Sequence, residues 1–183
     1  MNAISPIFPR RFRPRFGARP LLSMIVVAIA LFGLSPAVLA ADMAEVHKAI
    51  NEDRLFDAFR ELADLAKEGN PEAQYELAGF YHWGRVGAAN FPKARDWYQR
   101  SANQGNVDAM IGLAVMNGYG QGGPVDKRTA VKWLMIASDS QKLSQGDAAK
   151  IAQKRDQLAQ DLSPADLATA TAEAHAFQPK LEN

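Results

Sequence analysis

The sequence predicts an all-α fold, an α/α solenoid of helix pairs with atypical capping helices at its ends. The first observation is an internal repeat: residues 69–102 align without a gap on residues 105–138, and nine of these 34 positions are identical. The second is that apolar residues recur in each copy at the spacing of one helix face. The third is that no segment after residue 40 alternates apolar and polar residues as a strand does. Such a repeat indicates paired helices that stack on their neighbours.

The first 40 residues have the composition of a secretory signal peptide. They contain five arginines and no acidic residue, and an uncharged run, LLSMIVVAIALFGL, follows the arginines. Val38 and Ala40 then supply the small residues of a cleavage site. We therefore expect residues 1–40 to be removed after Ala40 and the protein to be exported, to the periplasm in a bacterium. The alternative is that residues 21–38 remain as a membrane anchor, although the apolar run is short for a permanent span.

Removal of residues 1–40 changes the charge balance of the chain. Lys plus Arg falls from 21 to 16 while Asp plus Glu stays at 20, so the net charge becomes about −4 instead of +1. No basic patch remains to attract nucleic acid. The chain has no cysteine, which excludes disulfide scaffolds, cysteine zinc sites and thiol nucleophiles.

Each repeat is expected to contain two helices, in units at about residues 69–104 and 105–140, with a partial unit before residue 69. Asparagine or aspartate precedes each helix, where its side chain can accept hydrogen bonds from the first backbone N–H groups. Glycine follows the last residue of a helix, where the backbone adopts the left-handed conformation. The capping residues are Asn70 and Asn106 for the first helices and Asn90 and Asp126 for the second helices, with Gly84 and Gly105 as stops.

The repeat pattern fades after Ser138, but two further amphipathic segments follow. AAKIAQKRDQLAQDL reads as one helix, and SPADLATATAEAHAF begins another with Ser163 as its N-cap. Such terminal helices cover the last apolar face of a solenoid. We expect the domain to extend over residues 41–177 and residues 178–183 to form a flexible tail.

The Trp97–Tyr98 pair could be a ligand platform or a packing element. Trp97 recurs as Trp133, and Tyr98 aligns with Leu134. The position of Tyr98 therefore requires a large side chain but not a phenol group. The repeat therefore predicts that the pair packs between helices, and that Trp97→Ala would unfold the domain.

These residues resemble the Sel-1-like repeat family, relatives of the tetratricopeptide repeat. The resemblance covers about residues 56–140. It departs from the family pattern at Ala78 and Ala114, where glycine is usual, in the order of Val86 and Gly87, and at Asn117, where tyrosine is usual. The resemblance implies an α/α solenoid with a scaffold or adaptor role. The matching residues are Ala73, Leu77, Tyr81, Gly84, Lys93, Ala94, Trp97, Tyr98, Ala102 and Gly105 in one copy and Ala109, Leu113, Gly120, Gly122, Asp126, Ala130, Trp133 and Ala137 in the next.

No catalytic, cofactor or metal site is predicted. His47, His82 and His175 fall on different expected helices, without the spacing of metal ligands. The segment GYGQGG, residues 118–123, lacks the Gly-Lys-Ser/Thr ending of a phosphate-binding loop and follows no strand. The acidic residues fall at helix starts or on polar faces and form no acid–base pair.

One helix face has more apolar character than a solvated face should have. On the first helices, opposite the core stripe, lie Tyr75, His82 and Trp83 and, one repeat later, Ile111, Val115 and Tyr119. Sideways packing of the first helices on one another could bury this face. The alternative is a partly apolar strip that accepts a peptide or partner helix, with Tyr75 and His82 as its most exposed members.

The sequence thus favours a non-enzymatic exported interaction or adaptor module that binds a protein or peptide partner. The other hypothesis is a cell-wall protein or enzyme accessory subunit that associates with peptidoglycan, which an aromatic and carboxylate-lined groove could hold. The scaffold residues do not name a partner, because repeat proteins take their function from what they bind.

Overall fold

The computed structural model describes the backbone of residues 36–182 and the side chains of residues 42–182. The chain divides into two units, residues 1–38 and 39–183. Apart from residues 36–38, the described residues belong to the second unit. The predicted signal peptide, residues 1–40, falls almost wholly outside the described residues. Within the described part, no helix combines the length and apolar character needed to cross a membrane.

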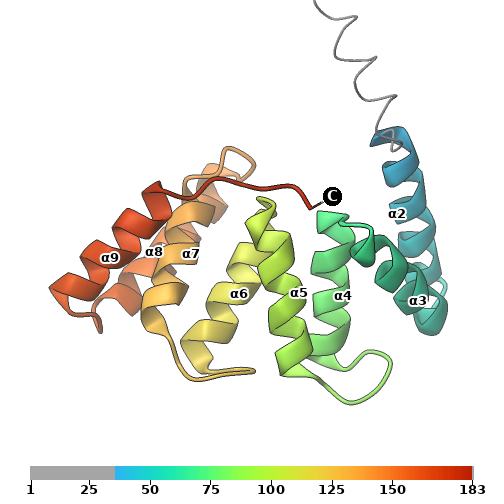
Figure 1. Cartoon of the computed structure of the whole chain (residues 1–183), viewed down its shortest axis with the longest axis horizontal. Helices are drawn as coiled ribbons and strands as arrows, with labels where there is room; N and C mark the ends of the chain where they lie inside the picture. Colours follow the sequence, from blue (N-terminus) through green and yellow to red (C-terminus); the bar gives the residue numbers. More distant parts are fainter. Residues whose placement is uncertain (1–35, 183) are drawn as a thin grey trace, which may run out of the picture. The chain divides into compact units, whose positions relative to one another are not determined.

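The described residues form eight helices and no strand (Figure 1). The all-α prediction is confirmed. From α3 to α7 each helix packs on the next along the chain, and α7 also packs on α8 and α9. The helices are α2 (Pro36–Asn51), α3 (Leu55–Lys67), α4 (Pro71–Trp83), α5 (Phe91–Asn103), α6 (Val107–Tyr119), α7 (Lys127–Ser138), α8 (Gln145–Ala159) and α9 (Pro164–His175).

The 36-residue repeat appears directly in the helix boundaries. The first helices of the two repeats, α4 and α6, begin and end at equivalent positions. The Asn70 side chain accepts hydrogen bonds from two backbone N–H groups of α4, and Asn106 accepts one from Ala109 in α6. Gly84 and Gly120 end these helices with φ of 63° and 70°, the left-handed conformation that favours glycine. The predicted helix starts and stops are therefore confirmed.

The buried side chains form two clusters. The first core joins α2, α3 and α4 and contains Val46, Leu62 and Phe80. The second core joins α4 to α8 and contains Leu113 and Trp133. Tyr81 and Trp97 are partly buried and pack against both cores. The two cores thus meet at the contact between α4 and α5.

The Trp–Tyr pair packs between helices, but its members differ in burial. Tyr98 is buried in the second core, as are Trp133 and Leu134 of the next repeat. Trp97 is only partly buried, and the Arg100 guanidinium lies 4.8 Å from its ring centre. Because part of the Trp97 ring already contacts solvent, Trp97→Ala should lower the free energy of unfolding by less than the loss of a fully buried tryptophan would.

Residues 178–182 make contacts with residues far away in the sequence. The sequence predicts a flexible tail at residues 178–183, and in the structure residues 178–182 lie against the turns that join helices of the repeats. The Lys180 N–H donates to the Asn103 carbonyl at 2.9 Å, and the Glu182 N–H donates to the Gln104 side chain at 3.1 Å. These partners lie some 80 residues earlier in the chain, so local composition could not reveal them.

Candidate functional site

An open groove separates the first helices of the two repeats. This α4–α6 groove has a volume of about 300 Å³. Its walls come from α4 and α6, and the buried Tyr98 of α5 lies at its floor. The lining residues are Tyr75, His82, Trp83, Tyr98, Asp108, Ile111, Gly112, Val115 and Gln121.

Tyr98 can occupy the floor because α6 carries glycine beside it. A methyl group at Gly112 would lie 3.1 Å from the Tyr98 ring, closer than most side-chain contacts, whereas one at Gly79 would make an ordinary contact at 3.9 Å from its hydroxyl oxygen. The Tyr98 ring also lies 5.9 Å from that of Tyr75. Burial raises the pKa of the Tyr98 phenol well above its ordinary value, so this hydroxyl stays protonated.

The structure leaves much of the predicted strip open to solvent. Trp83 is 73% exposed, Tyr119 is 64% exposed and Val115 is 38% exposed. Sideways packing of the first helices therefore does not cover these three side chains. It was wrong to expect Tyr75 and His82 to be the most exposed members, because Tyr75 is partly buried and His82 is only 7% exposed. Both lie deeper in the groove, against Tyr98.

His82 supports the exposed Trp83 ring. The two rings stack with centres 4.5 Å apart and planes 5° apart. Phe91 and Tyr98 approach the imidazole edge-on at 5.6 and 6.0 Å. This burial lowers the pKa of His82, only partly offset by the nearby Gln121 amide, so the ring is neutral at physiological pH. Trp83 is thereby held by a buried neighbour while most of its surface remains free for contact.

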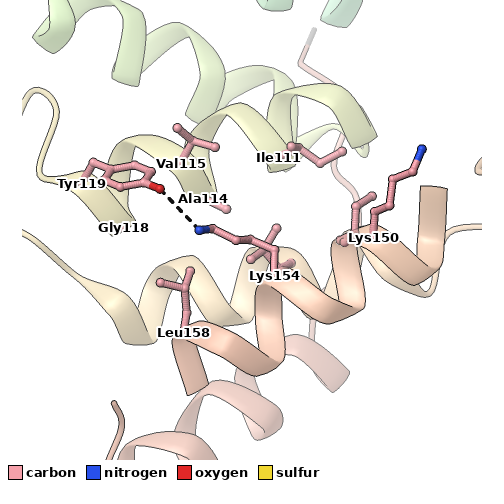
Figure 2. Close-up of a pocket in the computed structure, with 10 residues that line it drawn as sticks. Ile111, Ala114, Val115, Gly118, Tyr119, Lys150, Lys154 and Leu158 are labelled. Carbon is pink, nitrogen blue, oxygen red and sulfur yellow. Dashed lines mark hydrogen bonds between the residues drawn. The ribbon is translucent and has the colours of Figure 1, made fainter. Parts of the chain in front are cut away.

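A second hollow, the α6–α8 pocket, lies between α6 and α8 (Figure 2). Its volume is about 150 Å³, and apart from two lysines its lining is apolar or aromatic. Ile111 and Val115 line both this pocket and the α4–α6 groove, so the two hollows adjoin. The lining residues are Ile111, Ala114, Val115, Gly118, Tyr119, Leu134, Lys150, Ile151, Lys154 and Leu158.

The same repeat position lies at the base of both hollows. Leu134 lines the α6–α8 pocket at the slot that Tyr98 fills in the α4–α6 groove. The residue that follows the repeated tryptophan therefore packs in the core and also forms the floor of a hollow beside α6. The sequence indicated only the packing part of this role.

The two hollows differ in charge. Asp108 lines the α4–α6 groove, and burial together with the negative charges of Asp108 and Glu76 raises the pKa of Tyr75. Lys150 and Lys154 lie at the α6–α8 pocket, where the Lys154 ammonium is 3.3 Å from the Tyr119 hydroxyl (Figure 2). A bound partner would therefore meet negative charge at one hollow and positive charge at the other.

All six predicted strip residues line one or both hollows. Sequence reasoning missed Tyr98, Asp108, Gly112 and Gln121 in the groove, and it missed Leu134 and the four residues that α8 contributes to the pocket. The α8 residues lie outside the repeat, so no alignment within the chain could place them. Within the described part of the chain, no cluster of three or more His, Asp or Glu side chains could hold a metal ion.

The repeats match a known family. Residues 71–106 and 107–141 each match the family model of the Sel1 repeat. The chain carries two Sel1 repeats. The matched ranges begin with α4 and α6, so the structural and family boundaries coincide. Sel1 repeats are generally protein-interaction modules.

Similar proteins extend the comparison. A protective antigen of uropathogenic Escherichia coli, which displays an SLR fold, superposes with a TM-score of 0.68 at 20% identity, over 81% of this chain and 30% of that one. This likeness shows the Sel1-type solenoid fold. A Sel1 repeat protein from Oxalobacter formigenes has a TM-score of 0.48 and 16% identity, over 86% of this chain and 85% of that one.

A curated relative is the Arabidopsis thaliana ERAD-associated E3 ubiquitin-protein ligase component HRD3A. It is 31% identical over 68 residues, which cover 37% of this chain and 10% of that protein. This chain therefore spans a small part of the plant protein and less than a third of the Escherichia coli antigen.

Proposed function

We propose that this chain is an exported, non-enzymatic interaction module that binds a peptide or short helix of a protein partner in the α4–α6 groove and the α6–α8 pocket. The observation that carries the proposal is the exposure of Trp83, Val115 and Tyr119 on one face of the Sel1 repeats. Exposed aromatic side chains beside a preformed hollow are typical of interaction sites.

The two hollows favour a partner with a particular order of side chains. The α6–α8 pocket, with a volume of about 150 Å³, has room for one side chain. Its mostly apolar lining favours an apolar side chain there. Lys154 has no carboxylate partner among the ion pairs of the described residues, so it is available to a carboxylate of the partner. We therefore expect the partner to carry an apolar anchor with an acidic residue nearby.

The Trp83 ring supplies the second anchor. Its stack on buried His82 limits the orientations that it can take, so little side-chain freedom is lost when a partner covers it. An aromatic or aliphatic side chain of the partner would contact the open side of this ring. Both anchors lie on first helices or beside them, which makes the surface continuous across the repeats.

Site-specific photo-crosslinking in the native cell tests the proposal. A photoreactive phenylalanine analogue in place of Tyr119 should capture one protein species, and Trp83→Ala in the same chain should reduce that capture about tenfold or more. The matched control places the analogue at Phe56, which is also highly exposed (74%) but lies on α3, outside both hollows. Equal capture from both positions, or capture that Trp83→Ala leaves unchanged, would contradict the proposal.

A sacculus pull-down separates this proposal from the cell-wall alternative. The groove combines aromatic rings with Asp108, which are side chains that can hold a glycan or peptide of the wall. If purified sacculi retain the protein at high salt and Trp83→Ala releases it, the ligand is the wall and not a protein. We expect the protein to remain in the supernatant.

Export is the part of the proposal that concerns residues 1–40. The first buried core residue of the chain with described side chains is Met43, just after the predicted cleavage at Ala40, so a chain that starts at Ala41 keeps the buried residues of α2. Mass spectrometry of the protein recovered from its cells should give an N-terminus at Ala41 in the soluble envelope fraction. An intact N-terminus in the membrane fraction would favour the anchor instead.

A further inference from the structure

Residues 177–182 run along one edge of the repeats. The edge consists of the turns that join α3 to α4 and α5 to α6, and the segment crosses it after leaving α9 (Figure 1). We call this surface the repeat edge; its residues are Gly69, Gln74, Arg100, Asn103, Gln104 and Gly105. The edge lies at the beginning of α4, whereas Trp83 of the groove lies at its end, about 20 Å away along 13 residues of helix.

Two hydrogen bonds hold the backbone of the segment. The Lys180 N–H donates to the Asn103 carbonyl at 2.9 Å, and the Glu182 N–H donates to Gln104 Oε1 at 3.1 Å. Main-chain contacts of this kind bind an extended peptide and fix its register.

The Glu182 carboxylate is bound by two side chains of the edge. Gln74 Nε2 donates to it at 2.8 Å and Arg100 Nε donates at 3.1 Å. A buried amide network prepares this arrangement, because Gln104 Nε2 donates both to the Gly69 carbonyl at 2.9 Å and to Gln74 Oε1 at 2.8 Å. Gln74 and Gln104 are buried polar residues. Without the segment, Gln104 Oε1 would lose its hydrogen-bond partner in the structure.

The equivalent glycines of the two repeats make room for the segment. A methyl group at Gly105 would lie 3.2 Å from the Pro179 ring, and one at Gly69 would lie 3.0 Å from the Glu182 carbonyl oxygen. Larger residues would obstruct both approaches. The edge therefore contacts Pro179 at one repeat and Glu182 at the other, three residues apart.

The remaining side chains of the segment divide into an anchor and free positions. The Phe177 ring packs edge-on against Trp133 with ring centres 5.5 Å apart. Leu181 is 78% exposed, so its side chain adds little to the contact. The contacts thus select proline and glutamate in the pattern Pro-x-x-Glu, after an aromatic residue that packs on the second core.

We propose that the repeat edge is a peptide-binding site for an extended Pro-x-x-Glu segment, and that residues 177–182 occupy it as an intramolecular ligand. This site is separate from the groove and pocket of the proposed function and goes beyond it. A segment of the same pattern from another chain binds there only by displacing residues 178–182. The tethered segment competes at a high effective concentration, so the edge is closed to weak competitors.

A peptide-binding experiment tests the proposal directly. The probe is a fluorescent peptide with the sequence of residues 176–183, and the receptors are the full chain and a variant that lacks residues 178–183. The variant keeps Phe177, so the packing on Trp133 is retained. We expect saturable binding to the shortened variant by fluorescence anisotropy, and binding to the full chain that is about tenfold weaker or more, because its edge is occupied.

Matched peptides and a receptor variant test the specificity. The peptide with Glu182→Ala or Pro179→Ala should bind about tenfold more weakly or worse, whereas Leu181→Ala should bind as the parent does. Gln104→Leu in the shortened receptor should abolish binding. A folded shortened variant that binds no peptide, or that binds the Glu182→Ala peptide as tightly as the parent, would overturn the proposal.

If the shortened variant does not fold, amide hydrogen exchange in the full chain gives the answer. The Lys180 and Glu182 amides donate to the edge, so we expect both to exchange slowly in the unchanged chain. Glu182→Ala should speed their exchange about tenfold or more, and Leu181→Ala should not. Free exchange of these two amides in the unchanged chain would show that the edge does not bind the segment.

Discussion

Trp83 and Trp133 lie at opposite extremes of burial, and this difference separates contact residues from packing residues in the repeats. Trp133 is 2% exposed and packs within the second core, whereas Trp83 projects from the end of α4 and rests only on its neighbours. Tryptophan therefore stabilises the fold at position 133 and is available to contact a partner at position 83. Burial determines which role it has, because only a buried ring leaves a cavity when it is removed.

The two tryptophans should respond differently to truncation. Trp133→Ala should lower the free energy of unfolding by about 3–5 kcal/mol, the range for a buried aromatic side chain. Trp83→Ala should change it by less than about 1 kcal/mol, because most of the ring is already in water. Urea unfolding followed by circular dichroism measures both. Similar losses in the two variants would contradict the assignment of Trp83 to the contact surface.

The stability of the protein should fall in mild acid through His82. Burial lowers its pKa from the ordinary value of 6.5, so the unfolded chain binds a proton more readily than the folded chain. The stabilising contribution is therefore present above pH 6.5 and lost as the pH falls through the folded pKa. His82→Phe keeps an aromatic ring beside Trp83 but cannot titrate.

Urea unfolding between about pH 7.5 and about pH 5 measures this contribution. The unchanged chain should lose more unfolding free energy across that range than His82→Phe does. The Asp126 pKa is also lowered, but from 3.8, so its effect lies at more acidic pH. Equal losses in the two proteins would show that the His82 environment does not disfavour its charged form.

At the scale of elements, the sequence predicts the helices of the repeats well because their capping residues act locally. Asn70, Asn106 and Ser163 each accept a hydrogen bond from a backbone N–H two or three residues later. Such contacts depend only on nearby residues. The path of residues 178–182 depends instead on Gln74 and Gln104, which are distant in the sequence.

The sequence predicted part of the candidate site, because only contacts between residues close in the sequence can be read from spacing. Spacing within α4 and α6 brought together the six strip residues, but it could not rank their exposure. His82 and Trp83 are adjacent in the sequence, yet Phe91 and Tyr98 from α5 enclose only the first. The lysines of α8 come from a helix outside the repeat, so their place beside Tyr119 required the packed structure.

The N-caps allow a prediction for single helices. Asn106→Ala should lower the free energy of unfolding by about 1 kcal/mol, because the Ala109 N–H loses its side-chain acceptor. Asn106→Asp keeps an acceptor at the start of α6 and should restore most of that loss. Thermal unfolding of the three proteins at one pH checks both values. Equal destabilisation by alanine and aspartate would mean that the side-chain amide N–H, and not its oxygen, is the important group.

At the scale of the whole described unit, two aromatic side chains lie at the boundary between the two cores. Tyr81 and Trp97 pack against both cores, and α4 and α5 pack on each other beside them. Cooperative unfolding of the whole unit requires the two cores to be coupled across this boundary. The partly buried Trp97 therefore matters more for coupling than for the stability of either core.

Trp97→Ala should weaken this coupling as well as lower stability. The loss in unfolding free energy should be smaller than for Trp133→Ala, because Trp97 is only partly buried. The fluorine NMR signal of Trp133 in the fluorotryptophan-labelled chain reports on the second core, whereas circular dichroism reports on helices of both cores. In the unchanged chain the two signals should change at the same urea concentration, as a cooperative transition requires. In Trp97→Ala they should separate and the circular dichroism transition should broaden, while Trp83→Ala keeps them coincident. Coincident, sharp transitions in Trp97→Ala would show that the cores are coupled by other contacts.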